Sequence, residues 1–329
     1  MVMGAHGENM ISLTHVSQLV SEMAWSPDGT TLAIVSSGTS SDYTLSTYSF
    51  NENTLTVHIE DRPVLEGLSW LPDGQSIAIT SFVAGSGLSP QGTRPVTLLV
   101  IDLESGDTSR VVELDIPSRS WISWSPEGDH FAYIDDWDEE TGEGHLYVGS
   151  VEDKAPASLS LPVSRIFTGW PTWQSNASDH FAWSPDGSKI VYLWENDLYS
   201  TDLEGKSTRL TNVGEDERFG FPNDVSWSPD GSMIAFLGDV NAGVGLEIFV
   251  MLPDGSEIVR LAPDLMIQRW DWSPDSALIV AQSNGIIAPC PSPPCSGPHT
   301  EDPGIYILNV IEGTYTFSAV DGENPSFQP

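Results

Sequence analysis

A short phrase built on Trp-Ser-Pro-Asp-Gly recurs six times along the chain, and this repeat constrains the fold more than any other feature. Successive copies lie 44 to 59 residues apart. That period suits a four-stranded propeller blade and is too long for a leucine-rich or ankyrin unit. The tryptophans of the six copies are Trp25, Trp70, Trp124, Trp183, Trp227 and Trp272. The sequence therefore predicts an array of similar β-sheet units.

The residues around each copy carry the pattern of four short strands. Ser-Pro-Asp-Gly is turn chemistry, because Pro presets φ, Asp caps its own backbone and Gly tolerates a positive φ. An apolar or β-branched run follows each turn, as at 189–193, and two further runs come after it, as at 197–202 and 208–211. No segment shows a sustained 3.6-residue apolar period. We therefore predict an all-β, six-bladed β-propeller with four antiparallel strands, A to D, in each blade; seven blades are the alternative.

This repeat resembles the WD40-like PD40 repeat of TolB-type β-propellers. The resemblance rests on the Trp-Ser-Pro-Asp-Gly phrase, the Ile-Ala-Phe strand at 234–236 and the Arg-Leu-Thr at 209–211, and it covers residues 10–329. It concerns the propeller part only, without the α/β domain that precedes the propeller in TolB. Three copies depart from the pattern, since Leu71 replaces Ser, Glu127 replaces Asp and Ser276 replaces Gly. The resemblance implies a propeller fold and leaves the activity open.

The ends of the chain bear on how a propeller would close. We expect residues 1–9 to be a flexible N-terminal segment and residues 10–329 to form a single propeller domain. The segment 11–14 resembles a D strand, and 324–329 resembles the start of a further repeat. Pairing of the terminal strands would close the ring and cover an exposed sheet edge. A seventh blade shared by the two termini is the alternative.

The charge balance limits the partners that the protein can bind. There are 12 Lys and Arg residues against 47 Asp and Glu residues, which gives a formal net charge of −35. Such a surface repels nucleic-acid phosphates and anionic lipid headgroups. No run of 18 apolar residues is present, so membrane insertion is not expected. The expected partner is a protein, peptide or glycan, and the protein is expected to be a monomer.

The two ends of a propeller blade differ in their expected roles. The Ser-Pro-Asp-Gly phrases form the A–B turns, whose acidic residues we interpret as turn caps. The B–C loops and D–A connections lie at the opposite end, where loops of variable length on a rigid scaffold usually carry function. The long B–C loops are predicted at 83–95, 135–144 and 284–304, and the longest D–A connection at 161–180. In contrast, residues 194–197 form a tight hairpin.

Scarce basic residues concentrate in the predicted D–A connections, and they could form a positive mouth for a carboxylate, sulfate or phosphate. The alternative is that each arginine pairs with a neighbouring acid. The candidate arginines are Arg62, Arg119, Arg165, Arg218 and Arg269.

Aromatic residues outside the repeat core follow the same distribution. Aromatic faces beside polar groups are what sugar rings and extended peptides stack against, although the same side chains could instead wall the channel. His180, at the end of the longest connection, is included as a candidate. The aromatic candidates are Trp121, Trp170, Trp173 and Trp270.

Metal and cysteine chemistry add two smaller expectations. The acidic run containing Asp135, Asp136 and Asp138 is a weak Ca²⁺ candidate, but its spacing does not match an EF-hand, so a solvated loop is favoured and no cofactor is predicted. Cys290 and Cys295 lie at the two ends of a proline-stiffened loop and are predicted to form a disulfide. A disulfide and an acidic, lysine-poor surface favour a periplasmic or extracellular location.

These observations support two functions from different classes. The first is a non-catalytic binding propeller of the cell envelope or extracellular space, which binds its ligand or partner at the end formed by the B–C and D–A loops. The second is a lyase or glycosidase that acts on an acidic carbohydrate, with arginines holding the carboxylate and an Asp or His moving protons. The first is favoured, because spacing alone identifies no catalytic pair.

Overall fold

The structure of the chain is a computed structural model that describes most of the 329 residues. All the regular secondary structure of the described residues is β-strand. Within the described ranges no helix is long and apolar enough to cross a membrane. These ranges are 19–37, 42–62, 65–82, 93–117, 122–138, 141, 143–152, 159–164, 181–213, 219–240, 245–263, 265–288, 299–301 and 303–319.

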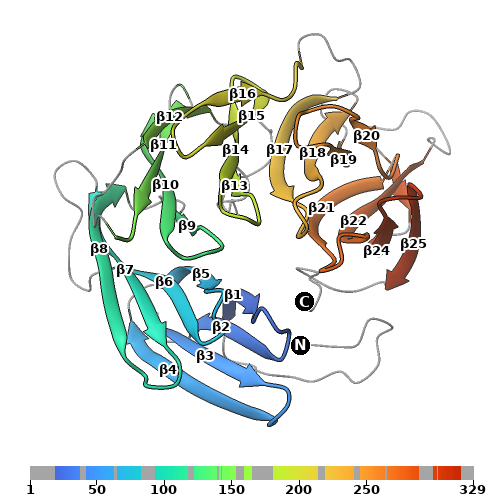
Figure 1. Ribbon diagram of the computed structural model, residues 1–329. Coiled ribbons are helices and arrows are strands. Elements are labelled where there is room, and N and C mark those ends of the chain that lie inside the picture. The colour runs from blue at the N-terminus through green and yellow to red at the C-terminus, as the bar shows by residue number, and fades with distance from the viewer. Residues whose placement is uncertain are drawn as a thin grey trace. The chain divides into compact units, whose positions relative to one another are not determined.

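The protein is an all-β, six-bladed β-propeller, as the repeat predicted, and each blade is an antiparallel sheet built from consecutive strands (Figure 1). The chain divides into two compact units, Met1–Pro162 and Val163–Gln328, with the boundary inside the last strand of blade 3. Blades 1 to 3 comprise β1(Leu19–Trp25), β2(Thr31–Ser37), β3(Tyr43–Ser49) and β4(Thr54–Arg62); β5(Leu65–Trp70), β6(Ser76–Phe82), β7(Thr93–Asp102) and β8(Thr108–Pro117); and β9(Ile122–Trp124), β10(His130–Asp138), β11(Glu143–Ser150) and β12(Leu159–Ser164).

Blades 4 to 6 repeat the arrangement, with one extra strand. The additional β23(His299–Glu301) pairs with β22 outside the four-stranded order of blade 6. The strands are β13(Phe181–Trp183), β14(Lys189–Trp194), β15(Asp197–Asp202) and β16(Ser207–Arg209); β17(Gly220–Trp227), β18(Ile234–Val240), β19(Gly245–Met251) and β20(Val259–Arg260); and β21(Leu265–Trp272), β22(Leu278–Ala288), β24(Gly304–Asn309) and β25(Thr314–Ala319).

In the first unit, the motif tryptophan of each following blade packs against the blade before it. Trp70 of blade 2 joins Val35 and Leu45 of blade 1 in one buried cluster. Its indole N–H also donates to the carbonyl of Ala24 at 2.9 Å. Trp124 of blade 3 packs in the same way into the cluster that contains Leu98 of blade 2. The repeat thus makes each blade a surface on which the next one packs.

The second unit uses the same packing. Trp227 of blade 5 lies in one buried cluster with Leu193 and Leu198 of blade 4. Trp272 of blade 6 lies in another with Ile248 of blade 5. The strand pattern of alternating faces explains this, because residues of one sheet face pack on one neighbour and residues of the other face pack on the next.

The three departures from the repeat motif have structural explanations. The Leu71 side chain fills the space beside Gly128 in the next blade, where a Cβ would lie 2.3 Å from Leu71 Cδ2. Ser276 adopts φ +61, as the motif glycine would, and its hydroxyl accepts a hydrogen bond from the backbone N–H of Asp230 at 3.1 Å. At the third departure, Glu127, a neighbouring carboxylate replaces the missing Asp, as described below.

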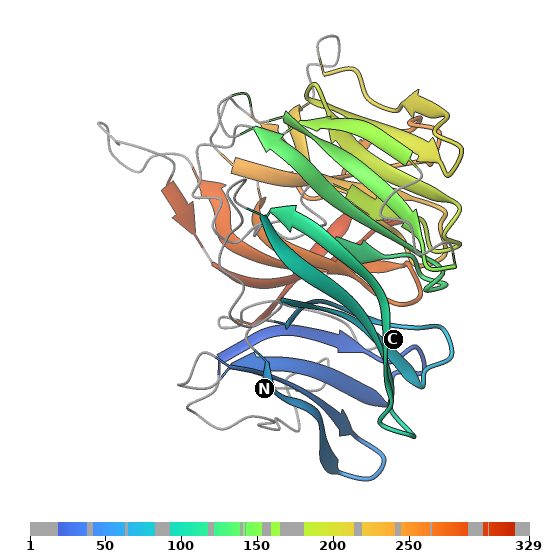
Figure 2. The ribbon, with the colours of Figure 1, turned by 90° about the vertical axis from the view of Figure 1, so that its left-hand side faces the viewer.

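Several predicted loops are shorter in the structure, because the strands that flank them continue to pair. β7 already begins at Thr93, so Arg94 and Pro95 lie in a strand rather than in the predicted loop. Figure 2 shows β7 and β8, coloured blue-green, as two long adjacent strands. β10 continues to Asp138, and β22 continues to Ala288. The terminal segments expected to pair with each other lie outside the described residues, so that closure stays a prediction.

Substitution of Gly255 tests how tightly neighbouring blades pack in the second unit. Gly255 has φ +83, and a Cβ there would lie 2.3 Å from the backbone oxygen of Leu210 in blade 4. We expect Gly255→Ala to lower the free energy of unfolding by about 3 kcal/mol, since both strain and overlap oppose it. Gly313→Ala is the matched control, because Gly313 also has a positive φ (+64) but nothing within 4 Å; it should cost about 1 kcal/mol. Equal losses of Tm for the two variants would contradict this packing.

Candidate functional site

The acidic residues of the A–B turns are caps of their own turns. In blade 1 the Asp28 carboxylate accepts hydrogen bonds from the Ser26 hydroxyl at 2.7 Å and from the Thr30 backbone N–H at 3.0 Å. The Ser26 hydroxyl oxygen in turn accepts the backbone N–H of Thr31 at 2.9 Å. Equivalent contacts hold Asp186, Asp230 and Asp275. These carboxylates have the structural role that the sequence predicted.

The hydrogen bonds also keep these carboxylates ionised. The backbone N–H and hydroxyl of Ser232, with the hydroxyl of Ser228, lower the pKa of Asp230 to about 2. The Ser26 hydroxyl and the Thr30 backbone lower the pKa of Asp28 in the same direction. A carboxyl group with a lowered pKa is a poor proton donor at neutral pH. The turn end of each blade is therefore suited to stability rather than to acid catalysis.

Blade 3 reaches the same result with a different residue. Glu127 occupies the motif Asp position, but the carboxylate that accepts the Ser125 hydroxyl at 2.9 Å belongs to Asp129. Asp129 also lies 2.9 Å from Nδ1 of His130. Burial alone would raise the pKa of Asp129, yet the hydrogen bonds from His130 and Ser125 lower it. The departure from the motif is compensated two residues later.

Three of the predicted arginines and aromatics lie within the described residues, namely Arg62, Arg269 and Trp270. Arg269 and Trp270 lie in the middle of β21 and not in the predicted D–A connection, because β21 keeps pairing with β22 across two bulges. Trp270 is half-buried against the cluster between blades 5 and 6. Arg62 is the last residue of β4, opposite Tyr43, and its side chain is not described.

The remaining candidates fall outside the described residues, so their grouping stays a prediction. They are Arg119, Arg165, Arg218, Trp121, Trp170, Trp173, His180, Cys290 and Cys295.

The acidic run proposed as a weak Ca²⁺ candidate belongs largely to a strand. Asp135 is half-buried in β10 and pairs with His145 of β11. Asp136 and Asp138 lie in the same strand, although their side chains are not described. Among the side chains that the structure does describe, no group of three His, Cys, Asp or Glu residues is arranged to hold a metal ion.

A half-buried carboxylate near the first strands of blades 1 to 3 escaped the sequence analysis. Glu22 of β1 accepts the backbone N–H groups of Gly67 at 3.0 Å and Leu68 at 2.7 Å, both at a bulge in β5. Burial raises the pKa of Glu22, and the two N–H groups oppose that rise. Gly67 has φ +65, and a Cβ there would lie 3.1 Å from the Ile122 backbone oxygen in β9. The contact fixes the junction of three strands.

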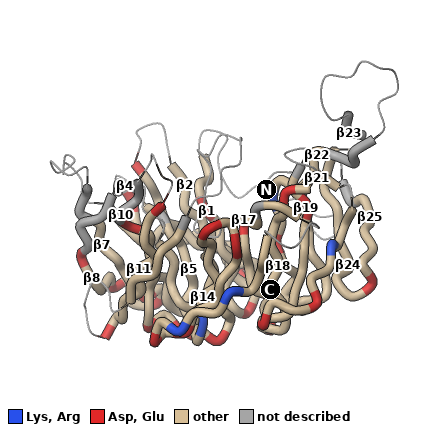
Figure 3. Tube along the Cα trace, turned by 90° about the horizontal axis from the view of Figure 1, so that it is seen from above, with Lys and Arg blue, Asp and Glu red and all other residues tan. Residues whose placement is uncertain are grey.

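Blades 4 and 5 each contain an ion pair between their third and fourth strands. The buried Asp197 carboxylate of β15 pairs with Arg209 of β16 and accepts the Thr211 hydroxyl at 2.8 Å. In blade 5 the fully buried Glu247 pairs with Arg260 in the same relative position. Both arginines lie on the fourth strand of their blade. Lys and Arg are otherwise sparse among the described residues (Figure 3).

Comparisons with known proteins agree with this architecture. Residues 140–242 match the family model of the dipeptidyl peptidase IV N-terminal region. The chain is 28% identical over 130 residues to prolyl endopeptidase FAP of Mus musculus, covering 36% of this chain and 16% of that protein. The match therefore spans less than a fifth of the length of that relative.

Solved structures extend the likeness over most of the chain. TolB from Acinetobacter baumannii is 16% identical, with a TM-score of 0.50, covering 83% of this chain and 58% of that chain. An oligogalacturonate lyase in complex with manganese is 14% identical, with a TM-score of 0.61, covering 90% of this chain and 75% of that chain. With six PD40-type repeats folded as six blades, the chain is a TolB-like, WD40-like β-propeller in its fold.

The lowered pKa of Asp230 gives a testable pH dependence. Its ordinary value is 3.8 and its value in the folded protein is about 2, so the stabilisation is complete above pH ~4 and is lost as the pH falls through 2. We expect Asp230→Ala to lower the free energy of unfolding by about 1 kcal/mol at pH 7, a figure limited by solvent screening of this exposed group. The deficit should shrink toward pH 2 in urea titrations.

Glu127→Ala is the matched control for Asp230→Ala, because Asp129 makes the turn contacts in that blade. It should leave stability nearly unchanged at pH 7. A pH-independent deficit for Asp230→Ala, or an equal loss for Glu127→Ala, would show that the turn carboxylates do not act as caps.

Proposed function

We propose that the protein is a non-catalytic binding propeller of the cell envelope or extracellular space. Its ligand or partner, a protein, peptide or glycan, binds at the blade ends formed by the B–C loops and D–A connections. The arginines and aromatics predicted from the sequence would contribute to that surface.

The observation that carries this proposal is the difference between the two ends of the blades. At the A–B end the turns are short, alike and occupied by their own hydrogen bonds, as at Asp28 and Asp230. At the other end the connection between the second and third strands varies from the two residues between β14 and β15 to the long insertion between β22 and β24. Variation on a repeated scaffold is typical of a binding surface.

The proposed location rests on charge and cysteine content. With three lysines among 329 residues and a net charge of −35, the surface suits an extracytoplasmic or saline setting. The two cysteines, six positions apart counting both, would form a disulfide only in an oxidising compartment.

A lyase or glycosidase acting on an acidic carbohydrate is the second candidate. The likeness of the fold to that of an oligogalacturonate lyase supports it, because such a propeller can hold a site of this kind. Arg269 would bind the sugar carboxylate, and an Asp or His would move the proton.

The proposal is tested by blocking each end of the blades in turn. A short Gly/Ser insertion after Pro263, in the connection between blades 5 and 6, is compared with the same insertion after Ile311, in a C–D turn of blade 6; both sites are exposed. Thermal-shift measurements screen neutral and acidic oligosaccharides, short peptides, phosphate, sulfate and Ca²⁺. A bound compound at a hundred times its Kd stabilises by about 2.7 kcal/mol. We expect the insertion after Pro263 to reduce the rise in Tm that the bound compound causes, and the insertion after Ile311 to preserve it.

Two results would contradict the proposal. A shift lost on insertion after Ile311 but kept after Pro263 would move the binding surface to the turn end. Release of an unsaturated product from oligogalacturonate, seen by its ultraviolet absorbance, would favour the lyase instead.

A further inference from the structure

We propose that blade 4 carries a platform for a neutral glycan, formed by Trp194, Tyr199, Arg209 and Asn212. The platform lies beside the B–C hairpin of that blade, so this inference rests on the proposed function and names a ligand class for it. It adds a site that the arginine and tryptophan pattern of the sequence did not single out.

Trp194 is unusual for its position in the repeat. It is the last residue of β14 and the seventh residue after Gly187 of the Ser-Pro-Asp-Gly turn. The other five blades have small or polar residues there, namely Ser36, Ser81, Asp135, Gly238 and Ser283. The fold therefore does not need a large side chain at this point. A half-exposed indole placed where five related blades have none requires another explanation.

The aromatic part of the platform has a fixed geometry. The Tyr199 ring lies 5.3 Å from the Trp194 ring and is stacked on the Tyr192 ring at 5.7 Å, centroid to centroid. Tyr192 is 2% exposed, and its hydroxyl donates a hydrogen bond to the Ser207 hydroxyl at 3.0 Å. Its ring is therefore fixed, and it supports the Tyr199 ring from the buried side. Trp194 and Tyr199 are both half-exposed. Two rings braced by a buried third ring form a rigid apolar surface.

The polar part is equally well held. Arg209 lies opposite Tyr199 on β16, and its side chain is 46% exposed. Asp197 and Asn212 orient its guanidinium group, the second through a 2.8 Å hydrogen bond. Asp197 is itself fixed by the Val213 backbone N–H at 2.9 Å. The guanidinium is thus positioned before any ligand arrives, which lowers the entropy cost of binding.

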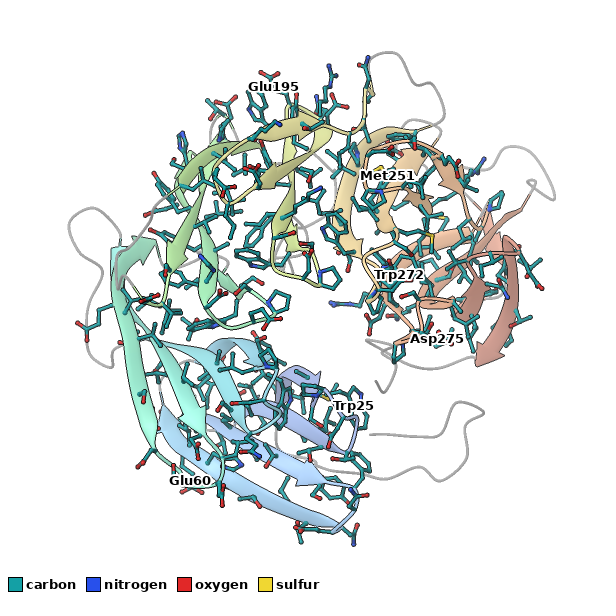
Figure 4. The ribbon with its side chains drawn as sticks, viewed as in Figure 1. Trp25, Glu60, Glu195, Met251, Trp272 and Asp275 are labelled. Carbon is teal, nitrogen blue, oxygen red and sulfur yellow. The ribbon has the colours of Figure 1, made fainter. Side chains whose placement is uncertain are left out.

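The hairpin leaves this edge of the blade open. Glu195 and Asn196 form a two-residue turn in which both residues have positive φ, 49° and 67°. Both side chains are exposed, and Figure 4 shows Glu195 pointing outward from the hairpin. A turn of this length adds no wall beside Trp194.

The local charge favours a neutral sugar over an anionic one. Asp197 offsets the charge of Arg209, and exposed Glu195 leaves a net negative patch on a protein of charge −35. A uronate would be repelled by this patch. A neutral sugar can place its apolar ring face on Trp194 and Tyr199 while its hydroxyl groups hydrogen-bond to Arg209 and Asn212.

Isothermal titration calorimetry with cellohexaose, xylohexaose and mannohexaose tests the platform. At least one of these probes should bind, and Trp194→Ser should weaken that binding about tenfold or more. Serine occupies this position in blades 1, 2 and 6, so the variant should fold with an unchanged Tm. Phe317→Ser, which removes another exposed aromatic of the same unit, is the matched control and should leave the affinity unchanged.

The opposite results would overturn the platform. One such result is that no neutral hexasaccharide binds at millimolar concentration. Another is that Trp194→Ser and Phe317→Ser lose equal amounts of affinity. A third is that, when trigalacturonate and a cationic peptide are titrated as well, only one of these two binds. The proposed function is tested by a different experiment, namely the effect of the insertion after Pro263 on ligand binding. A ligand lost on that insertion but unaffected by Trp194→Ser would leave the function standing and remove the glycan platform.

Discussion

The packing of a motif tryptophan against the preceding blade of the same unit is the interaction on which the rest of each unit depends. Trp70 and Trp124 in the first unit, and Trp227 and Trp272 in the second, are nearly buried in clusters that join two sheets. Burial of one indole contributes roughly 4–6 kcal/mol as an upper bound. A single four-stranded sheet could not bury both of its faces alone, so cohesion between blades is what makes the repeat stable.

The turn that follows each tryptophan makes this arrangement repeatable. Its Asp and Ser side chains satisfy the backbone groups of the turn, as Ser26 and Asp28 show, and keep one end of the blade short. Where the motif changes, a neighbouring group restores the contact, as Asp129 does in blade 3. The opposite end carries no such constraint on length. Binding chemistry can therefore change there without loss of the core, which is the basis of the proposed function.

The fold could be predicted from the sequence because its information is local and repeated. Turn residues, apolar runs and a regular period gave the blade number and the strand order correctly. Strand ends were predicted less well, since pairing extends β10 to Asp138 and places Arg269 inside β21. Local sequence does not show where a partner strand continues to offer hydrogen bonds.

The functional residues were harder to predict because they depend on contacts between distant segments. Glu22 meets Gly67 across two blades, and no spacing rule connects them. Trp194 could have been found by aligning the six repeats, because it replaces Ser, Asp or Gly at one position. Its stacking with Tyr199 and the orientation of Arg209 required the structure.

Hydrogen–deuterium exchange, with and without the compound that most raises Tm, tests the central claim most directly. The account predicts protection in the B–C and D–A segments, with the turn amides of Thr31, Lys189 and Met233 unchanged, since those amides already donate to serine hydroxyls. New protection at these turns, with none at the opposite end, would contradict it.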